Sequence, residues 1–165
     1  TKSGYSGAGK KFNLNNIKSN NELNFYNYNT NNHRHIIEIN QELKKFINNE
    51  NLNFSFNPHI LPNFRGMLST IYCDLKINIS KKNIINEYKE FENNNCFIKF
   101  IETNERLDLF SVQNTNFCKI KIFNHHSENK IIIVSGIDNL IKGAAGQAIQ
   151  SLNIIEGFDE KLSLI

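Results

Sequence analysis

The sequence predicts an α+β domain in which a mainly antiparallel sheet carries helices on one face. Several short segments alternate apolar and polar residues, as strands do, whereas only three segments show helical spacing. The strands also come in runs instead of alternating regularly with helices, which favours α+β over a parallel α/β sheet. A length of 165 residues fits one domain, 1–165, with a core of its own.

Regular periodicity begins after a glycine-rich segment, 1–11, and an irregular asparagine-rich segment, 13–32. Apolar residues spaced three, four or seven apart then predict a helix over 36–48. Leu52, Phe54 and Phe56 alternate with asparagine and predict a strand, which Asn57-Pro58 ends because proline has no N–H for a ladder. Alternation from Met67 to Ile79 predicts a long strand with one buried face.

The second half of the chain continues in the same way. Ile84, Ile85, Tyr88 and Phe91 predict a second helix. Further strands are expected at Phe97–Ile101, Leu109–Val112, Phe117–Phe123 and Lys130–Val134, the last two as a hairpin through the polar loop Asn124–Asn129. A final helix over about 139–153 is expected to be capped by Asp138 or Asn139.

Composition excludes several classes of function. The net charge is +3 and the lysines are scattered among acids, which argues against a nucleic-acid partner. No apolar run approaches the ~18 residues of a membrane helix. Cys73, Cys96 and Cys118 form no close-spaced pair, which favours reduced thiols in a cytoplasmic location. The chain opens on Thr1 without a signal segment, so we expect a fragment of a longer protein.

Residues Gly4–Lys11 nearly match the phosphate-binding loop of nucleotide hydrolases. Lys11 stands where that motif needs the hydroxyl that holds magnesium, and no strand is expected ahead of the loop. The favoured interpretation is a small-residue loop whose backbone N–H groups can approach an anion.

The triplet His33-Arg34-His35 is the first candidate for acid–base chemistry. Glu38 follows His35 by three residues, one helical turn along, where a carboxylate can orient an imidazole. The alternative, an exposed basic loop, is favoured by spacing alone. A zinc site is not expected, because the triplet supplies two ligands and no third stands at a standard spacing. His125-His126 lies in the predicted hairpin loop and is expected to be solvated surface.

Two further features point to ligands or to packing. Arg65 can bind a phosphate or carboxylate through two N–H groups, although a surface arginine is the commoner case. Gly143 and Gly146 leave one face of the last helix bare, either for a flat ligand near Asn139 and Lys142 or for close helix packing.

Four motifs in sequence resemble the C-terminal half of N-acetyl-gamma-glutamyl-phosphate reductase, a family related to aspartate-semialdehyde dehydrogenase. They cover nearly the whole chain, in the family's order: Lys2-Ser3-Gly4-Tyr5-Ser6-Gly7-Ala8-Gly9; Tyr28 with His33-Arg34-His35, Glu38 and Ile39; Pro58-His59-Ile60-Leu61-Pro62 with Arg65-Gly66 and Thr70-Ile71-Tyr72; and Asp138 to Gln150. A C-terminal Phe158-Asp159-Glu160 accompanies them.

The resemblance implies the catalytic domain of a two-domain enzyme, with the sheet of the glyceraldehyde-phosphate dehydrogenase class. The missing part would be an N-terminal Rossmann domain that binds NADP, in the same or a separate chain, and the last helix would pack on it. In this family a cysteine thiolate displaces phosphate from an acyl phosphate and NADPH reduces the thioester. That cysteine lies in an Asn-Pro-Gly-Cys-Tyr type motif upstream and is not in this chain. The isolated chain is therefore expected to be inactive. The expected partners are a small-molecule acyl phosphate and further copies of the chain in a homo-oligomer.

Residue roles follow from the resemblance. His35 or His33 would be the acid/base, with preference for His35, and Glu38 its orienter. Arg34, Arg65 and Ser3 would bind substrate. The cofactor would be met by Ser6, Gly7, Ala8, Gly9, Asn139, Lys142, Gly143 and Gly146, and no metal is expected.

Departures from the family pattern leave alternatives open. Lys10 stands for the usual arginine, Ile37 for proline, and Asn114 for a glycine, where asparagine can keep a left-handed conformation. An aspartate-semialdehyde dehydrogenase type of reductase is the rival within the enzyme class. A non-catalytic remnant that acts as a binding or oligomerisation module is the rival outside it. Asparagine, at roughly thirty residues, exceeds ordinary usage and is attributed to an AT-rich coding sequence.

Overall fold

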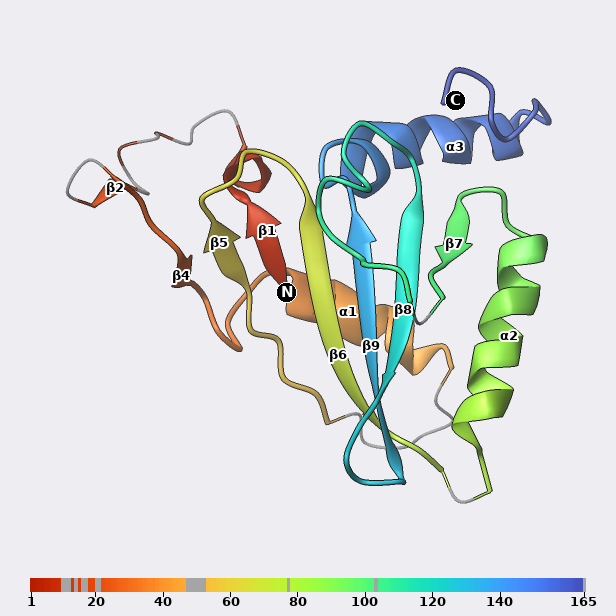
Figure 1. The fold of residues 1–165 in the computed structure, drawn as a ribbon. Coiled ribbons are helices and arrows are strands. Elements are labelled where there is room, and N and C mark those ends of the chain that lie inside the picture. Colours follow the sequence, from red (N-terminus) through yellow and green to blue (C-terminus); the bar gives the residue numbers. More distant parts are fainter. Residues whose placement is uncertain are drawn as a thin grey trace.

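A seven-stranded sheet forms the centre of the computed structural model, which describes residues 1–9, 13, 15, 18–19, 22–46, 53–76, 78–102 and 104–164 (Figure 1). The strand order is β4-β5-β1-β6-β9-β8-β7. In chain order the strands are β1 (Lys2–Gly4), β4 (Tyr26–Asn27), β5 (His59–Leu61), β6 (Met67–Asp74), β7 (Ile98–Phe100), β8 (Cys118–Asn124) and β9 (Lys130–Ile137). A separate pair joins β2 (Lys18–Ser19) and β3 (Glu22–Leu23).

Antiparallel pairing dominates the sheet. The central strands β6, β9 and β8 pair antiparallel over their length, from Met67 opposite Ile137 to Asp74 opposite Lys130. β1 pairs antiparallel with β6 and β4 with β5, whereas β1 with β5 and β7 with β8 are parallel. The predicted α+β class with a mainly antiparallel sheet is confirmed.

The helices lie behind the sheet, beside one edge of it and at one of its ends (Figure 1). In Figure 1 α1 (His35–Lys44) passes behind the strands, α2 (Lys81–Asn93) flanks β7, and α3 (Gly146–Ile155) lies at the end of the sheet where the C-terminus is found. Two shorter helical turns are η1 (Tyr5–Ala8), which is 3-10, and η3 (Ile141–Ala145), which is a π-helix. Within the described part of the chain, no helix has the length and apolar character to cross a membrane.

Most of the predicted elements are present. The helix over 36–48 is α1, with residues 47 and 48 outside the described residues, and the second predicted helix is α2. Ser80 begins α2 because its Oγ accepts a hydrogen bond from the backbone N–H of Asn83 at 3.2 Å. The hairpin through Asn124–Asn129 is confirmed as β8 and β9.

Two predicted strands are wrong. Leu52 lies outside the described residues, and 53–56 is an irregular segment held by a turn: Phe56 N donates to Asn31 Oδ1 at 3.1 Å, and Asn31 N donates to Phe56 O at 3.0 Å. At Leu109–Val112 the chain makes local turns, because Asp108 Oδ1 accepts from Ser111 N at 3.0 Å. In both places a polar side chain takes the backbone N–H that a ladder would need.

The long strand differs from its prediction in length and in burial. β6 ends at Asp74, short of the expected Ile79, and neither of its faces is sealed, since Ile71 is 45% and Tyr72 69% exposed. These neighbours point to opposite faces of the sheet. The glycine loop also has a strand ahead of it, β1, which the sequence did not predict.

The last helix begins with a π turn that the apolar pattern did not reveal. Asp138 is the cap, because its Oδ1 accepts from Leu140 N at 2.8 Å and from Ile141 N at 3.0 Å. Gly143 N then donates to Asp138 O and Ala145 N to Leu140 O, each five residues back. Regular α-helix follows from Gly146.

The apolar core of the described residues draws on β5, β8 and β9, on the residues that flank β7 and on the loop before β8. It contains Ile60, Phe97, Ile101, Val112, Ile120, Ile122 and Ile131. Many large apolar side chains remain exposed, among them Ile37 and Phe46 near α1 and Ile155 on α3. Where exposed apolar side chains form one patch, they are typical of a surface that associates with another domain or chain.

Four asparagines adopt a left-handed backbone. Asn29, Asn31, Asn78 and Asn114 have φ angles of 45°, 54°, 73° and 61°. The first two form the turn that leads into α1, and Asn114 confirms the conformation expected at that position.

Candidate functional site

An open hollow of about 470 Å³ joins the glycine loop to the histidine triplet. The lining residues come from η1, from β4 and the segment between β4 and α1, and from β5. These segments meet because β5 pairs with β1 on one side and with β4 on the other. The lining residues are Gly7, Ala8, Tyr26, Tyr28, Asn29, Asn32, His33, Arg34 and Ile60. The lining combines one guanidinium, one imidazole, two phenols and two amides, and this donor-rich set suits an anionic ligand with carbonyl or carboxylate oxygens.

His33 is held from several sides. The backbone N–H of His35 donates to His33 Nδ1 at 3.2 Å. The rings of Tyr28 and Phe56 each lie 5.4 Å from the His33 ring in edge-on geometry. Desolvation, together with the charges of His35 and Arg34, lowers the pKa of His33, and Glu38 opposes this shift.

His35 is exposed and lies just outside the hollow. It opens α1, with its ring centroid 4.6 Å from that of His33. Glu38 is exposed one turn further along the helix. Among the described residues, no hydrogen bond joins Glu38 to His33 or to His35. The expected roles of His35 and Glu38 stay predictions.

The glycine loop is fixed by its neighbours in the chain fold. Gly4 N donates to Gly66 O at 2.8 Å and Ser6 N to Phe64 O at 3.0 Å. A Cβ on Gly4 would lie 2.6 Å from Phe64 O, so this close approach of two backbones requires glycine. Ser3 lies under the loop, with its Oγ 3.2 Å from where a Cβ of Gly7 would be.

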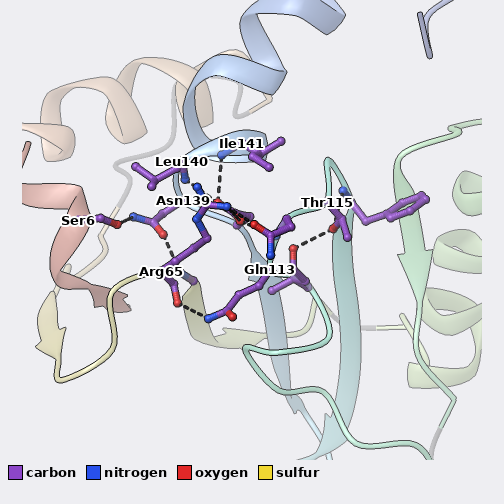
Figure 2. A network of polar contacts seen from close by, with 12 residues as sticks. Ser6, Arg65, Gln113, Thr115, Asn139, Leu140 and Ile141 are labelled. Carbon is purple, nitrogen blue, oxygen red and sulfur yellow. Dashed lines mark hydrogen bonds and ion pairs between the residues drawn. The ribbon is translucent and has the colours of Figure 1, made fainter. Parts of the chain in front are cut away.

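Arg65 is engaged inside the chain. Its Nη1 lies 3.4 Å from Asp138 Oδ2 and also donates to Asn114 Oδ1. Asp138 is fully buried and accepts three backbone N–H groups, those of Asn114, Leu140 and Ile141 (Figure 2). Arg65, which is expected to bind substrate, thus forms an ion pair in which the carboxylate is buried and the arginine side chain is 25% exposed.

Asn139 uses both ends of its amide for the chain itself. Its Oδ1 accepts from Gly66 N at 2.7 Å, and its Nδ2 donates to Ser6 Oγ at 2.9 Å (Figure 2). Asn139 thus fastens the glycine loop to the start of η3.

Lys142 and the two helical glycines lie on a second polar cluster. Lys142 Nζ donates to Gln150 Oε1 at 2.6 Å and sits 5.5 Å from the centre of the Phe97 ring. Burial lowers the pKa of Lys142. Gly146 is buried, and a Cβ there would lie 2.4 Å from Asn116 Oδ1, whereas Gly143 is exposed. Close packing thus accounts for Gly146.

None of the three cysteines has the surroundings of a nucleophile. Burial raises the pKa of the thiols of Cys73, Cys96 and Cys118, so the thiolate is disfavoured at each. Among the residues described, no group of three or more His, Cys, Asp or Glu side chains is arranged to hold a metal ion.

Sequence reasoning reached part of this site only. His33, Arg34, Gly7 and Ala8 were expected, and Tyr28 was noted through the resemblance. Ile60 was also named through the resemblance, whereas Tyr26, Asn29 and Asn32 were missed. Asn29 carried a signal as a turn former ahead of the triplet.

Comparison with known proteins gives a consistent result. Residues 1–139 match the family described as semialdehyde dehydrogenase, dimerisation domain. An N-acetyl-gamma-glutamyl-phosphate reductase from Caldicellulosiruptor bescii is 47% identical over 165 residues, which are 100% of this chain and 48% of that protein. One from Methanococcus maripaludis strain C7 is 43% identical over 164 residues, 99% of this chain and 47% of that protein. The chain spans about half the length of these curated relatives.

Solved structures share the fold. Aspartate semialdehyde dehydrogenase from Francisella tularensis matches with a TM-score of 0.56 and 20% identity over 72% of this chain and 33% of that one. Aspartate semialdehyde dehydrogenase II from Vibrio cholerae matches with a TM-score of 0.51 and 14% identity over 62% and 31%.

Proposed function

Because the chain belongs to the semialdehyde dehydrogenase dimerisation-domain family, we propose that it is the substrate-binding half of an arginine-pathway reductase. The complete enzyme would reduce N-acetylglutamyl 5-phosphate to N-acetylglutamate 5-semialdehyde with NADPH and release phosphate. The observation that carries this proposal is 47% identity, over the whole chain, to a protein of that name. The aspartate semialdehyde dehydrogenases, at 14 to 20% identity, support the fold alone.

The other half of the enzyme would bring the nucleotide-binding domain and the cysteine nucleophile, upstream in the same chain or as a separate one. Attack of its thiolate on the acyl carbon forms a C–S bond and breaks the C–O bond to phosphate, and the phosphate leaves with its electron pair. NADPH, when bound, would supply the hydride that reduces the acyl carbon, and the C–S bond would then break to release the semialdehyde and return the cysteine thiolate. The raised pKa of each of the three thiols here supports a nucleophile from elsewhere.

This chain's residues would bind the substrate and handle protons. Arg34, in the wall of the hollow, suits a carboxylate or phosphate of the substrate. His35, with His33 beside it, is the candidate acid/base, and Glu38 its orienter. Ser3 supports the glycine loop from below. Arg65 would act through Asp138, so its contribution to substrate binding is indirect.

Part of the expected cofactor surface fits a bound nucleotide. Gly7, Ala8 and Gly9 are exposed, so their backbone is open to an NADP group, and Gly143 is exposed as well. Ser6, Asn139 and Lys142 have their side chains hydrogen-bonded within the chain, and Gly146 is covered by Asn116. These four would support the cofactor surface without forming it.

Partners and location follow the same proposal. The exposed side chains of β6, Ile71 and Tyr72, support a homo-oligomer, and those of α3, such as Ile155, support packing on the missing half. The three cysteines are free thiols, which supports a cytoplasmic enzyme.

Reconstitution tests the proposal. The chain alone should not oxidise NADPH with N-acetylglutamyl phosphate, and activity should appear when the upstream half, carrying the Asn-Pro-Gly-Cys segment, is joined or added. Strong activity of the chain alone would contradict it, as would a reconstituted enzyme that prefers aspartyl phosphate. A reconstituted pair that binds but never turns over would favour the non-catalytic remnant.

A further inference from the structure

One nitrogen of His33 is already committed to the backbone. The His35 N–H donates to His33 Nδ1 at 3.2 Å, so Nδ1 is an acceptor and carries no proton. In a neutral imidazole the single proton then resides on Nε2. Placing a proton on Nδ1 would set two N–H groups against each other and break this bond.

The surroundings of His33 also disfavour a charged ring. The adjacent Arg34 and His35 are basic, Glu38 is the acidic group that acts on His33 among the described residues, and Tyr28 faces the ring from the segment after β4. The rings of Tyr28 and Phe56 hold the imidazole from two sides and desolvate it. Both effects lower the pKa of His33.

The second nitrogen is available for a ligand. Among the described residues none forms a hydrogen bond with Nε2 of His33, while the side chain lines the hollow together with Arg34 and the backbone of Gly7 and Ala8. A neutral imidazole in this position presents one fixed N–H to whatever oxygen enters the hollow.

We propose that His33 works as a neutral hydrogen-bond donor, through Nε2–H, to the carbonyl oxygen of a bound acyl substrate. The inference rests on the proposed function for the identity of the substrate. Its geometric part, a neutral Nε2–H form of His33, stands without it. Such a donor stabilises negative charge that develops on the oxygen during attack at the acyl carbon.

The chain contains a matched control. His125 Nδ1 accepts from Ser127 N at 3.0 Å, the same backbone bond two residues on, but His125 is not among the residues that line the hollow. It shares the backbone hydrogen bond with His33 but not the hollow.

Nitrogen-15 NMR of the histidine rings in the full chain tests the geometric part. Both His33 and His125 should show a protonated Nε2 and a bare Nδ1 at neutral pH, and His33 should take up its second proton at lower pH than a free imidazole does. A proton on Nδ1 of His33 at neutral pH, or protonation of His33 at the pH of a free imidazole or above, would overturn the proposal whatever the enzyme's activity.

Two substitutions test the donor in the reconstituted enzyme. The amide N–H₂ of His33→Gln falls near the place of Nε2, whereas the amide of His33→Asn falls near Nδ1 and supplies no donor to the ligand. Turnover should stay within about tenfold for His33→Gln and fall about 10²–10³-fold for His33→Asn. The acidic limb of the pH–rate profile should persist in His33→Gln. Equal losses in both variants, or loss of that limb, would instead make His33 the base.

If wild-type reconstituted enzyme shows no reductase activity, the proposed function fails and the NMR result still decides the state of His33.

Discussion

Asn139 Nδ2 donates to Ser6 Oγ at 2.9 Å, across 133 positions of sequence. The same side chain accepts from Gly66 N at 2.7 Å. One amide thus joins three segments: the glycine loop, the entry to β6 and the start of η3. The loop wall of the hollow is therefore set from a part of the chain that does not line it.

Replacing Asn139 by alanine should loosen this junction. The Gly66 amide would lose its acceptor in a buried position, a change that typically costs about 1–3 kcal/mol. Hydrogen exchange at Gly66 and Ser6 should accelerate, while Asn86→Ala, on an exposed position of α2, should leave both rates unchanged. Unaltered protection of Gly66 in Asn139→Ala would show that the amide does not hold the loop.

Removal of the Asp138 carboxylate should be far more costly than removal of a surface one. Asp138→Ala removes the carboxylate that pairs with Arg65 and leaves three backbone N–H groups without an acceptor, so we expect about 3–5 kcal/mol lost from the free energy of unfolding. Glu42→Ala breaks an exposed pair with Lys45 and should cost below about 1 kcal/mol. Urea denaturation measures both, and comparable losses would refute the structural role of Asp138.

The two helical glycines should respond differently to the same substitution. Gly146→Ala forces a Cβ to within 2.4 Å of Asn116 Oδ1 in a buried site, and such overpacking costs about 1–3 kcal/mol. Gly143→Ala meets Ile137 Cδ1 at 3.4 Å, an ordinary contact, and should be neutral or slightly stabilising. Thermal unfolding of the two variants should rank them in that order, and a reversed order would exclude packing as the reason for Gly146.

The pKa of His33 links stability to pH. Because that pKa is lowered in the folded chain, the unfolded chain binds the proton more tightly. Stability is therefore complete above the unfolded value of 6.5 and falls as pH drops from there to the folded pKa. Between about pH 8 and about pH 5, the wild-type chain should lose more unfolding free energy than His33→Gln. Urea denaturation measures both proteins. If the wild-type chain and His33→Gln lose equal unfolding free energy over this range, His33 does not link stability to pH.

In the assembled enzyme, His35→Asn should lower turnover at least about a hundredfold with near-normal NADPH binding. The substitution removes proton transfer but keeps some hydrogen bonding. His125→Asn, on the hairpin loop, should retain full activity. Steady-state kinetics decide the matter: a His35→Asn enzyme within a few-fold of wild type would exclude His35 as the acid/base.

Local patterns in the sequence predicted the elements that local forces control. The α2 cap is one residue, Ser80, bonded three positions on, and the β8–β9 hairpin joins neighbours in the chain. The segment at Phe56 was mispredicted because its apolar alternation is real but its N–H is taken by Asn31, 25 residues away. At Asp108 the competing bond is local, and the side chain of an aspartate ahead of the segment was the available signal.

The candidate site likewise contains parts that the sequence predicts and parts that it does not. The triplet and the glycine loop are contiguous motifs, so the sequence identified them directly. Arg65 pairs with Asp138 instead of facing the hollow because the loop before β6 packs against the start of η3. No spacing rule relates positions 65 and 138, so tertiary structure alone reveals that partner.

The asparagines with positive φ show one structural role for the high asparagine content of the chain. Among ordinary residues, asparagine tolerates a positive φ best after glycine, because its short polar side chain can bond to the local backbone. The chain has 8 glycines, and turns at positions 29, 31, 78 and 114 are built from asparagine instead. An abundance of asparagine thus supplies turn formers where glycine would otherwise stand. At these four positions glycine is the tolerated replacement, whereas alanine would strain the backbone.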